Sequence, residues 1–244
     1  MPALFAEWPE HVLDAAGVGP GDSVLDIACG TGVLARAASD RVGGDRVVGV
    51  DVNEGMLAVA RAAAPGIAWR RGPAETLPFG DHSFDRVVSQ FGLIFFDDRS
   101  KAISEMLRVV TPEGAVSVAV WTSLEATPGY AAVTEILTDL FGAVVAESIR
   151  APYSLGDPGK LGRLFAEAGA GEVTVRTIPG MARFESVGDW IHTDIKGWTL
   201  ADVIDDEGYE RFRREASQRL SRFVLADGTV AFDAPAHIAT TFAI

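Results

Sequence analysis

Short apolar runs alternate with amphipathic segments over the first half of the chain. Runs of this kind are typical of strands buried on both faces of a parallel sheet, and five are predicted here: Ser23–Ala28, Arg46–Val50, Ile67–Arg71, Phe84–Gln90 and Ala115–Trp121. Helices are predicted between them. The clearest is Ser100–Val110, whose apolar residues follow the i, i+3, i+4, i+7 spacing of a helix with one buried face. The alternation indicates βαβ units.

The last third of the chain is mainly helical in its pattern. Two further strands are predicted at Glu172–Ile178 and His237–Ala243, and the predicted helices are Tyr130–Val145, Leu161–Ala168, Ser186–Lys196 and Glu207–Phe223. A helical insertion at about 180–230 therefore precedes the last strand. Long insertions over a sheet commonly serve as lids or pocket walls. The fold class we predict is α/β, with a doubly wound, seven-stranded Rossmann-like sheet and helices on both faces.

Composition and charge narrow the possible partners. The chain has 244 residues, 48% of them apolar and 23% charged, which is typical of a globular protein. Its formal net charge of −13 disfavours binding to nucleic acid. Apolar stretches are too short for a membrane span, and the first residues do not resemble a secretory signal. With Cys29 as its one cysteine, we expect a cytoplasmic protein, monomeric or homodimeric.

The segment Val24–Gly32 runs from a strand through a glycine turn into a helix. Glycines permit close approach of a ligand, and the helix N-terminus offers N–H groups to it. The pattern Gly30-Thr31-Gly32 alone also fits a dinucleotide fold or any tight strand–helix turn. Asp26 adds a carboxylate within a buried strand. It either holds a cationic ligand group or hydrogen-bonds the amides of the turn.

Asp51 ends the second predicted strand. An acidic residue at this place accepts hydrogen bonds from both ribose hydroxyls in dinucleotide folds, although it could instead cap the following helix, for which Asn53 is better placed. Val52 and Met56 are positioned to sandwich an adenine ring, or else they pack between helix and sheet. In the turn after the third strand, Glu75 is either a ligand contact or a surface residue.

These motifs together resemble a known family. VLDIACGTG, VDVNEGML, GPAETLPF, DHSFDRVVSQFGL and RVVTPEGAVSVAVW stand in the order and spacing of class I S-adenosylmethionine-dependent methyltransferases, in the small-molecule branch related to ubiquinone-biosynthesis methyltransferases. The resemblance covers about residues 20–122. It implies methyl transfer from S-adenosylmethionine to an O, N or C nucleophile of a small molecule, and an antiparallel last strand. Two alternatives are a nicotinamide-dependent oxidoreductase and a protein that binds S-adenosylmethionine without transferring its methyl group.

The resemblance also implies roles for individual residues. The methionine part of the cofactor would lie against Asp26, Gly30, Thr31 and Gly32, its ribose against Asp51, and its adenine against Val52, Met56, Ala74 and Glu75, whereas Gln90 and Phe91 would face the sulfonium and the substrate. The family usually has Asp where this chain has Pro73, so Glu75 or a backbone carbonyl must supply that adenine contact. We expect one domain over 1–244, with a cofactor-binding half at 1–122 and a substrate-covering half at 123–244.

The helix Ser186–Lys196 carries the predicted substrate side. Asp194 falls in the middle of its apolar stripe with Trp190, whereas His192 falls on the opposite side. A carboxylate on an apolar face either lines a pocket or forms a salt bridge, so Asp194 and Trp190 are predicted to face the substrate, with the salt bridge as the alternative. No cluster with metal-ligand spacing occurs, and we expect no metal requirement.

Overall fold

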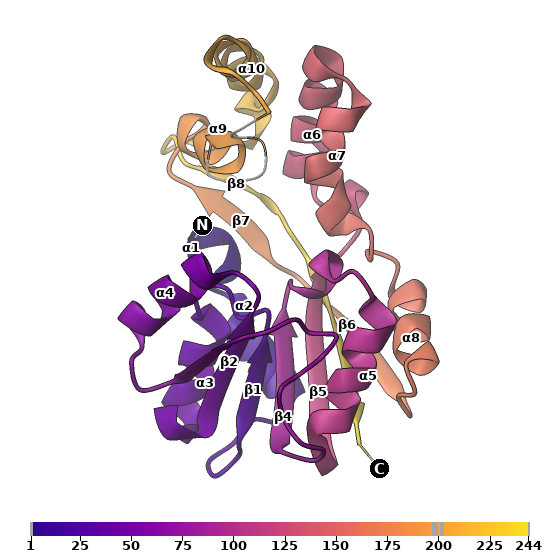
Figure 1. Ribbon diagram of the computed structural model, residues 1–244. Coiled ribbons are helices and arrows are strands. Elements are labelled where there is room, and N and C mark those ends of the chain that lie inside the picture. Colours follow the sequence, from indigo (N-terminus) through magenta and orange to yellow (C-terminus); the bar gives the residue numbers. More distant parts are fainter. Residues whose placement is uncertain (1, 197–199, 201–202, 244) are drawn as a thin grey trace. The chain divides into compact units, whose positions relative to one another are not determined.

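The computed structural model describes residues 2–196, 200 and 203–243, and the chain divides into two compact units (Figure 1). The sheet unit comprises Phe5–Val120, Asp157–Thr177 and His237–Ile244, and the helical unit comprises Met1–Leu4, Trp121–Gly156 and Ile178–Ala236. The predicted insertion at about 180–230 lies in the helical unit. The organisation as one domain stays a prediction.

The described part of the sheet unit is built on a seven-stranded sheet with the order β3-β2-β1-β4-β5-β9-β6. Its strands are β1 Val24–Ile27, β2 Val47–Asp51, β3 Ala68–Arg71, β4 Phe84–Gln90, β5 Val110–Trp121, β6 Val173–Ile178 and β9 Ala236–Phe242. All four residues of the central strand β1 are buried. The edge strand β3 exposes Arg70 and Arg71, and such charges oppose pairing with a further strand.

Strand directions in the sheet are mixed. β1 is parallel to β2 and β4, and the pairs β2–β3 and β4–β5 are also parallel. β9 is antiparallel to β5, because Ala243 N–H donates to the Gly114 carbonyl and the Ser117 hydroxyl lies 3.1 Å from that of Thr240. Partner numbers therefore fall along β9 as they rise along β5. The predicted fold class and the antiparallel last strand are both confirmed.

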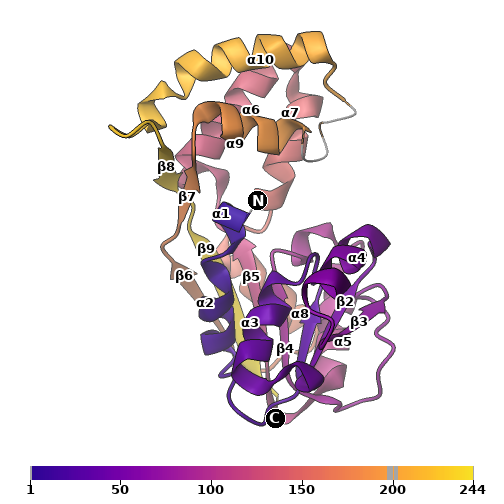
Figure 2. The same ribbon diagram turned by 90° about the vertical axis from the view of Figure 1, so that its left-hand side faces the viewer.

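The helices of the sheet unit are α2 Trp8–Ala15, α3 Val33–Val42, α4 Glu54–Ala63, α5 Arg99–Val109 and α8 Pro158–Glu167. They pack beside the sheet, where α2 contacts α3 (Figure 2) and α5 contacts α8 (Figure 1). Side chains cap several of their first turns: Asn53 accepts from Met56 N–H, and Asp98 accepts from Lys101 N–H. These caps satisfy donors that a helix N-terminus leaves without partners, so α4 and α5 begin where the sequence places Asn53 and Asp98.

Aromatic side chains form the core of the helical unit. It contains α6 Pro128–Phe141, α7 Ala143–Arg150, α9 Val187–Lys196 and α10 Asp206–Arg219, together with the antiparallel hairpin β7 Met181–Phe184 and β8 Val230–Asp233. Trp190 is fully buried and stacks on Phe184 at 5.5 Å between ring centroids. Phe232 lies 4.6 Å from Trp190 by the same measure. The hairpin is thereby fixed to α9.

Three features differ from the sequence prediction. The helix expected at 130–145 is divided at Gly142, whose φ of +87° ends α6 and starts α7. The fifth strand begins at Val110 and contains an irregular stretch with Glu113 at φ +65°, so Pro112 and Gly114 lie within it. The hairpin β7–β8 and the N-terminal helices α1 Pro2–Phe5 and α2 were not predicted, and each of these elements is short.

Candidate functional site

The turn after β1 is built on left-handed backbone. Ala28, Gly30 and Gly32 have φ values of +56°, +54° and +82°, and Gly32 N–H donates to the Cys29 carbonyl at 2.8 Å. Gly32 is also the N-cap of α3 and provides no side-chain cap. The first turn of α3 therefore presents its positive end at the carboxyl edge of the sheet, where ligands of open α/β folds bind.

The ring of Trp69, on β3, leaves room only for glycine at position 32 of the turn and at position 49 of β2. A Cβ at Gly32 would lie 2.4 Å from the Trp69 ring, and a Cβ at Gly49 would lie equally close. The indole N–H donates to the Ala64 carbonyl at 3.0 Å, which fixes the ring. Trp69 thus supports the glycine turn from the neighbouring strands, a role that the sequence analysis did not assign to it.

Asp26 is the most unusual polar residue of the sheet unit. It is 1% exposed, and neither carboxylate oxygen has a hydrogen-bond partner among the described residues. Burial raises the pKa of Asp26 well above its usual range, and the charge of Asp51 adds to the rise. The Ala35 amide lies near enough to oppose the rise but does not form a hydrogen bond with either oxygen. The amides of the turn do not satisfy this carboxylate, so the alternative in which Asp26 only braces the turn is not supported.

Asp51 connects β2 to the glycine turn. Its Oδ2 accepts from Gly30 N–H and its Oδ1 from Asn53 N–H, both at 2.8 Å. Asn53, and not Asp51, caps α4. Since a carboxylate oxygen has two lone pairs, each oxygen keeps capacity for a further donor. Asp51 is therefore not the cap of α4, and that alternative is wrong. Its role as an acceptor for the ribose hydroxyls stays a prediction.

The predicted adenine contacts lie around the end of β2. Val52 and Met56 are 58% and 41% exposed, so they do not pack between helix and sheet. Ala74 is buried. Glu75 Oε1 accepts from the amides of Asp97 and Asp98, at 3.0 and 3.4 Å. Glu75 is therefore not a free surface residue, and this bond holds the loop that precedes α5.

At the end of β4, Gln90 and Phe91 contact the N-terminal segment of the same unit. Gln90 Nε2–H donates to the Phe5 carbonyl at 3.1 Å, while its Oε1 is buried without a partner among the described residues. Phe91 has a φ of +59°, and its ring packs against those of Phe5 and Trp8 at 5.6 and 5.7 Å. The aromatic side chain of Phe91 is thus engaged by residues that the sequence analysis missed.

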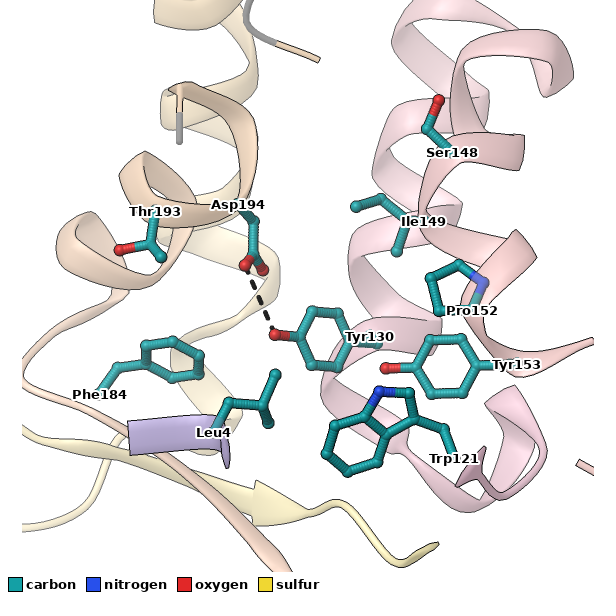
Figure 3. A pocket seen from close by; sticks show the side chains of 10 residues that line it. All are labelled: Leu4, Trp121, Tyr130, Ser148, Ile149, Pro152, Tyr153, Phe184, Thr193 and Asp194. Carbon is teal, nitrogen blue, oxygen red and sulfur yellow. Dashed lines mark hydrogen bonds between the residues drawn. The ribbon is translucent and has the colours of Figure 1, made fainter. Parts of the chain in front are cut away.

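A separate pocket lies within the helical unit (Figure 3). Its empty space, including the open mouth, is about 510 Å³. It is lined by Leu4, Trp121, Tyr130, Ser148, Ile149, Pro152, Tyr153, Phe184, Thr193 and Asp194. Figure 3 shows Asp194 pointing from α9 toward the Tyr130 hydroxyl of α6, and Tyr153 beside Tyr130. A predicted substrate residue and several aromatic residues that were not predicted are therefore brought together here.

Asp194 accepts hydrogen bonds from neutral donors. Trp190 Nε1–H reaches its Oδ2 at 2.8 Å, and the Tyr130 hydroxyl lies 3.5 Å from its Oδ1. Burial raises the pKa of Asp194 to about 7, although these two hydrogen bonds act in the opposite direction. The carboxylate therefore changes its ionisation near neutral pH. The described residues give Asp194 no salt bridge to Lys, Arg or His, which removes the alternative that the sequence left open.

Trp190 lies behind the pocket wall and does not line it. It is 0% exposed and is surrounded by the aromatic core of the helical unit. Trp190 can therefore affect a ligand in the pocket through its hydrogen bond to Asp194 and not by direct contact. His192 is exposed, as predicted, with its ring 6.3 Å from that of Tyr209.

The described residues contain neither a metal-binding cluster nor a membrane-spanning helix. No group of three or more His, Cys, Asp or Glu side chains is placed to hold a metal ion. None of the described helices combines the length and apolar character that crossing a membrane requires.

Comparisons with known proteins bear on the same segments. A family model described as a methyltransferase domain matches residues 24–114, which include the glycine turn, Asp51 and Gln90. The demethylmenaquinone methyltransferase of Renibacterium salmoninarum is 36% identical over 186 residues, covering 71% of this chain and 76% of that protein. The corresponding protein of Beutenbergia cavernae is 38% identical over 184 residues, with 71% and 75% covered.

A solved structure shares the fold over nearly the whole chain. The YcgJ protein of Bacillus subtilis covers 97% of this chain and 98% of its own, with a TM-score of 0.62 and 19% identity. At this identity the likeness concerns the fold alone.

Proposed function

Because this chain belongs to the class I S-adenosylmethionine-dependent methyltransferases, we propose that its cofactor binds at the carboxyl ends of β1 and β2, between Asp26 and Asp51. The chain is an enzyme that transfers a methyl group from S-adenosylmethionine to a small molecule. When bound, the cofactor supplies a methyl carbon that is made electrophilic by its sulfonium. The comparisons give no support to a nicotinamide-dependent oxidoreductase or to a binding protein without transferase activity.

One observation carries this placement of the cofactor. Asp26 is a buried carboxylate without a hydrogen-bond partner among the described residues, and a buried carboxylate is costly unless a donor or cation reaches it. The ammonium of the methionine part is such a cation. In our proposal it interacts with Asp26, while the carboxylate end of the methionine lies against the backbone of Gly30, Thr31 and Gly32 at the positive end of α3.

The remaining contacts follow from the neighbouring residues. Asp51 accepts from the ribose hydroxyls with the lone pairs that its bonds to Gly30 and Asn53 leave. The exposed side chains of Val52 and Met56 cover the adenine ring, and Ala74 forms its edge. Because the Glu75 side chain is bound to the loop before α5, a backbone carbonyl of residues 72–76 replaces the contact that Pro73 cannot make.

Gln90 and Phe91 complete the proposed cofactor side. The unpartnered Oε1 of Gln90 is an acceptor suited to a sulfonium methyl group, whose hydrogens carry partial positive charge. Phe91 contributes backbone at this place, since its ring is packed against Phe5 and Trp8.

Calorimetry with S-adenosylmethionine and S-adenosylhomocysteine tests the placement. We expect both to bind the wild-type protein and Asp26→Asn to weaken S-adenosylmethionine and S-adenosylhomocysteine alike, by at least about tenfold, since both carry the ammonium. Asp85→Asn is the matched control, because Asp85 bonds Ser23 near the other end of β1. Unchanged affinity in Asp26→Asn would place the cofactor elsewhere.

The acceptor side is proposed at the pocket of the helical unit, with Asp194 in contact with the substrate and Trp190 positioning Asp194. The names of the relatives offer demethylmenaquinone as a first acceptor to assay, by release of S-adenosylhomocysteine. We also propose a cytoplasmic enzyme, monomeric or homodimeric, without a nucleic-acid partner, in keeping with its single cysteine and its net charge of −13.

A further inference from the structure

The pocket of the helical unit combines aromatic rings with one carboxylate. Trp121, Tyr130, Tyr153 and Phe184 are among its lining residues, and Asp194 is the charged one among the ten drawn in Figure 3. These side chains come from separate elements: the end of β5, α6, the short helix at 151–153, β7 and α9. Their convergence on one space is decided by the tertiary structure of this unit.

No described Lys, Arg or His side chain forms a salt bridge with Asp194, and the positive charge of the chain's amino terminus is the weakest of the influences that lower its pKa. The partners of Asp194 are an indole N–H and a phenol hydroxyl, which are neutral. Several basic residues of the same unit pair with other carboxylates, among them Lys196 with Asp206, and Arg219 with Glu135 and Asp139. Neutral donors satisfy lone pairs but do not neutralise charge, and the cost of ionising a buried carboxylate remains. A positively charged ligand would remove that cost.

Aromatic rings favour the same kind of ligand. The face of an aromatic ring carries partial negative charge and attracts an ammonium, and the attraction grows as water is excluded. Tyr130 and Tyr153 lie with their ring centroids 6.0 Å apart beside Asp194. We propose that this pocket binds the methyl acceptor through a positively charged nitrogen, so that the substrate class is a lipophilic amine. The proposal rests on the proposed methyltransferase function.

The comparisons do not assign this specificity. Demethylmenaquinone, after which the relatives are named, has no basic nitrogen, so its methylation by this chain would contradict the proposed amine class. The family model matches residues 24–114, whereas the pocket is formed by Leu4 and by side chains between positions 121 and 194. The class of ligand that the pocket binds therefore has to be inferred from the residues of this chain that line it.

Two isosteric probes test the charge requirement. We expect 2-phenylethylamine, a cation at pH 8, to bind the wild-type protein at least tenfold more tightly than neutral 2-phenylethanol in calorimetric titrations. In Asp194→Asn, which keeps an acceptor for the Trp190 N–H, the preference should fall to within about threefold. His192→Gln is the matched control on the same helix, because His192 is exposed, and it should retain the full preference. Equal affinity for the two probes, preference for the alcohol, or a preference that survives in Asp194→Asn would overturn the proposal.

Variants of Tyr153 test the aromatic contribution without disturbing the core around Trp190. Tyr153 is half-buried, and Tyr153→Phe keeps the ring while Tyr153→Leu removes it. We expect affinity for 2-phenylethylamine to change less than twofold in Tyr153→Phe and to fall by about fivefold or more in Tyr153→Leu. A loss in both variants would assign the effect to the hydroxyl and contradict recognition by the ring.

The pH dependence gives an independent readout. Binding of an ammonium requires ionised Asp194, whose pKa is about 7. The titratable groups that face it, Tyr130 on α6 and Tyr153 in the short helix at 151–153, stay neutral because burial raises the pKa of each. We expect 2-phenylethylamine to bind about tenfold more weakly at pH 6 than at pH 8, with release of nearly one proton at pH 6. Affinity that is independent of pH would contradict this.

A failure here can be distinguished from a failure of the proposed function. Every variant is also titrated with S-adenosylhomocysteine, whose proposed site lies in the sheet unit. Normal binding of S-adenosylhomocysteine without preference for the amine would refute the substrate class and leave the methyltransferase assignment intact. Loss of S-adenosylhomocysteine binding by the wild-type protein would instead refute the cofactor site.

Discussion

Two carboxylates, Asp26 and Asp194, are placed where ionisation is unfavourable without a ligand. Asp26 has no hydrogen-bond partner among the described residues, and Asp194 has neutral ones. Burial raises the pKa of each. Carboxylates of this kind cluster at functional sites, because a ligand can supply the hydrogen-bond donor or the positive charge that the protein itself does not provide. At the scale of the residue, these two side chains are therefore the strongest pointers to ligand binding.

Asp194 should make the stability of the protein depend on pH. The folded pKa is about 7 and the ordinary value is 3.8, so the folded state holds this proton more strongly than the unfolded chain. Stability from this group is present below about pH 4 and is lost as pH rises to about 7. The loss is up to about 4 kcal/mol, and less to the extent that water reaches the carboxylate.

Asp194→Asn should remove that dependence. Compared with the wild type in urea unfolding, the variant should be similar in stability at pH 4.5 and more stable by about 1–4 kcal/mol at pH 8. Loss of stability at both values would show that ionised Asp194 is part of the structural core, and would contradict the cost assigned to its charge.

Asp51 provides a second prediction for a single residue. Asp51→Ala should weaken S-adenosylmethionine and S-adenosylhomocysteine by at least about 1.5 kcal/mol, since the ribose hydroxyls lose a charged acceptor. Asn53→Ala is the control: it removes the cap of α4, so it should lower stability by about 1 kcal/mol and preserve cofactor affinity. If calorimetry gave the same affinities for Asp51→Ala and the wild type, Asp51 would serve only to hold the glycine turn.

At the scale of the elements, the glycine turn between β1 and α3 depends on β3. Gly30 and Gly32 both have positive φ, but a Cβ at Gly30 would meet nothing within 4 Å, whereas one at Gly32 would meet Trp69 at 2.4 Å. Replacing either glycine by alanine thus carries the cost of a positive φ, whereas only the replacement at Gly32 also causes a steric clash.

The two glycines should therefore respond differently to alanine. Gly30→Ala should cost about 1 kcal/mol from backbone conformation alone, and Gly32→Ala should cost about 1–3 kcal/mol more because the ring or the turn must move. Urea unfolding measures both variants. Equal losses would show that Trp69 moves aside freely and does not support the turn.

For the whole molecule, the two units predict two separable sites. Hydrogen exchange should show that S-adenosylhomocysteine slows the amides of residues 28–32 and 51–56 in the sheet unit. By contrast, 2-phenylethylamine should slow those of 148–153 and 190–196 in the helical unit, because each ligand stabilises what it contacts. If the amine alone slowed 28–32 and left 148–153 and 190–196 unchanged, it would bind in the cofactor site and not in the pocket around Asp194.

Much of the sheet unit could be predicted from the sequence. Buried parallel strands are short apolar runs, and their carboxyl ends are marked by Asp26, Asp51 and the glycines between them, so local signals give the strand positions and the place of the two carboxylates. Asn53 likewise specifies the start of α4, since its cap acts within three residues. These features are encoded over short distances along the chain.

The tertiary structure alone decided how distant side chains meet. Trp69 supports Gly32 across two strands, Phe5 and Trp8 engage Phe91, and Tyr130 reaches Asp194 across 64 positions of sequence. The hairpin β7–β8 joins segments nearly 50 residues apart. Periodicity reports which face of an element is apolar but not which element covers it. For that reason the strands and the carboxylates at their ends could be predicted from the sequence, whereas the aromatic pocket around Asp194 could not.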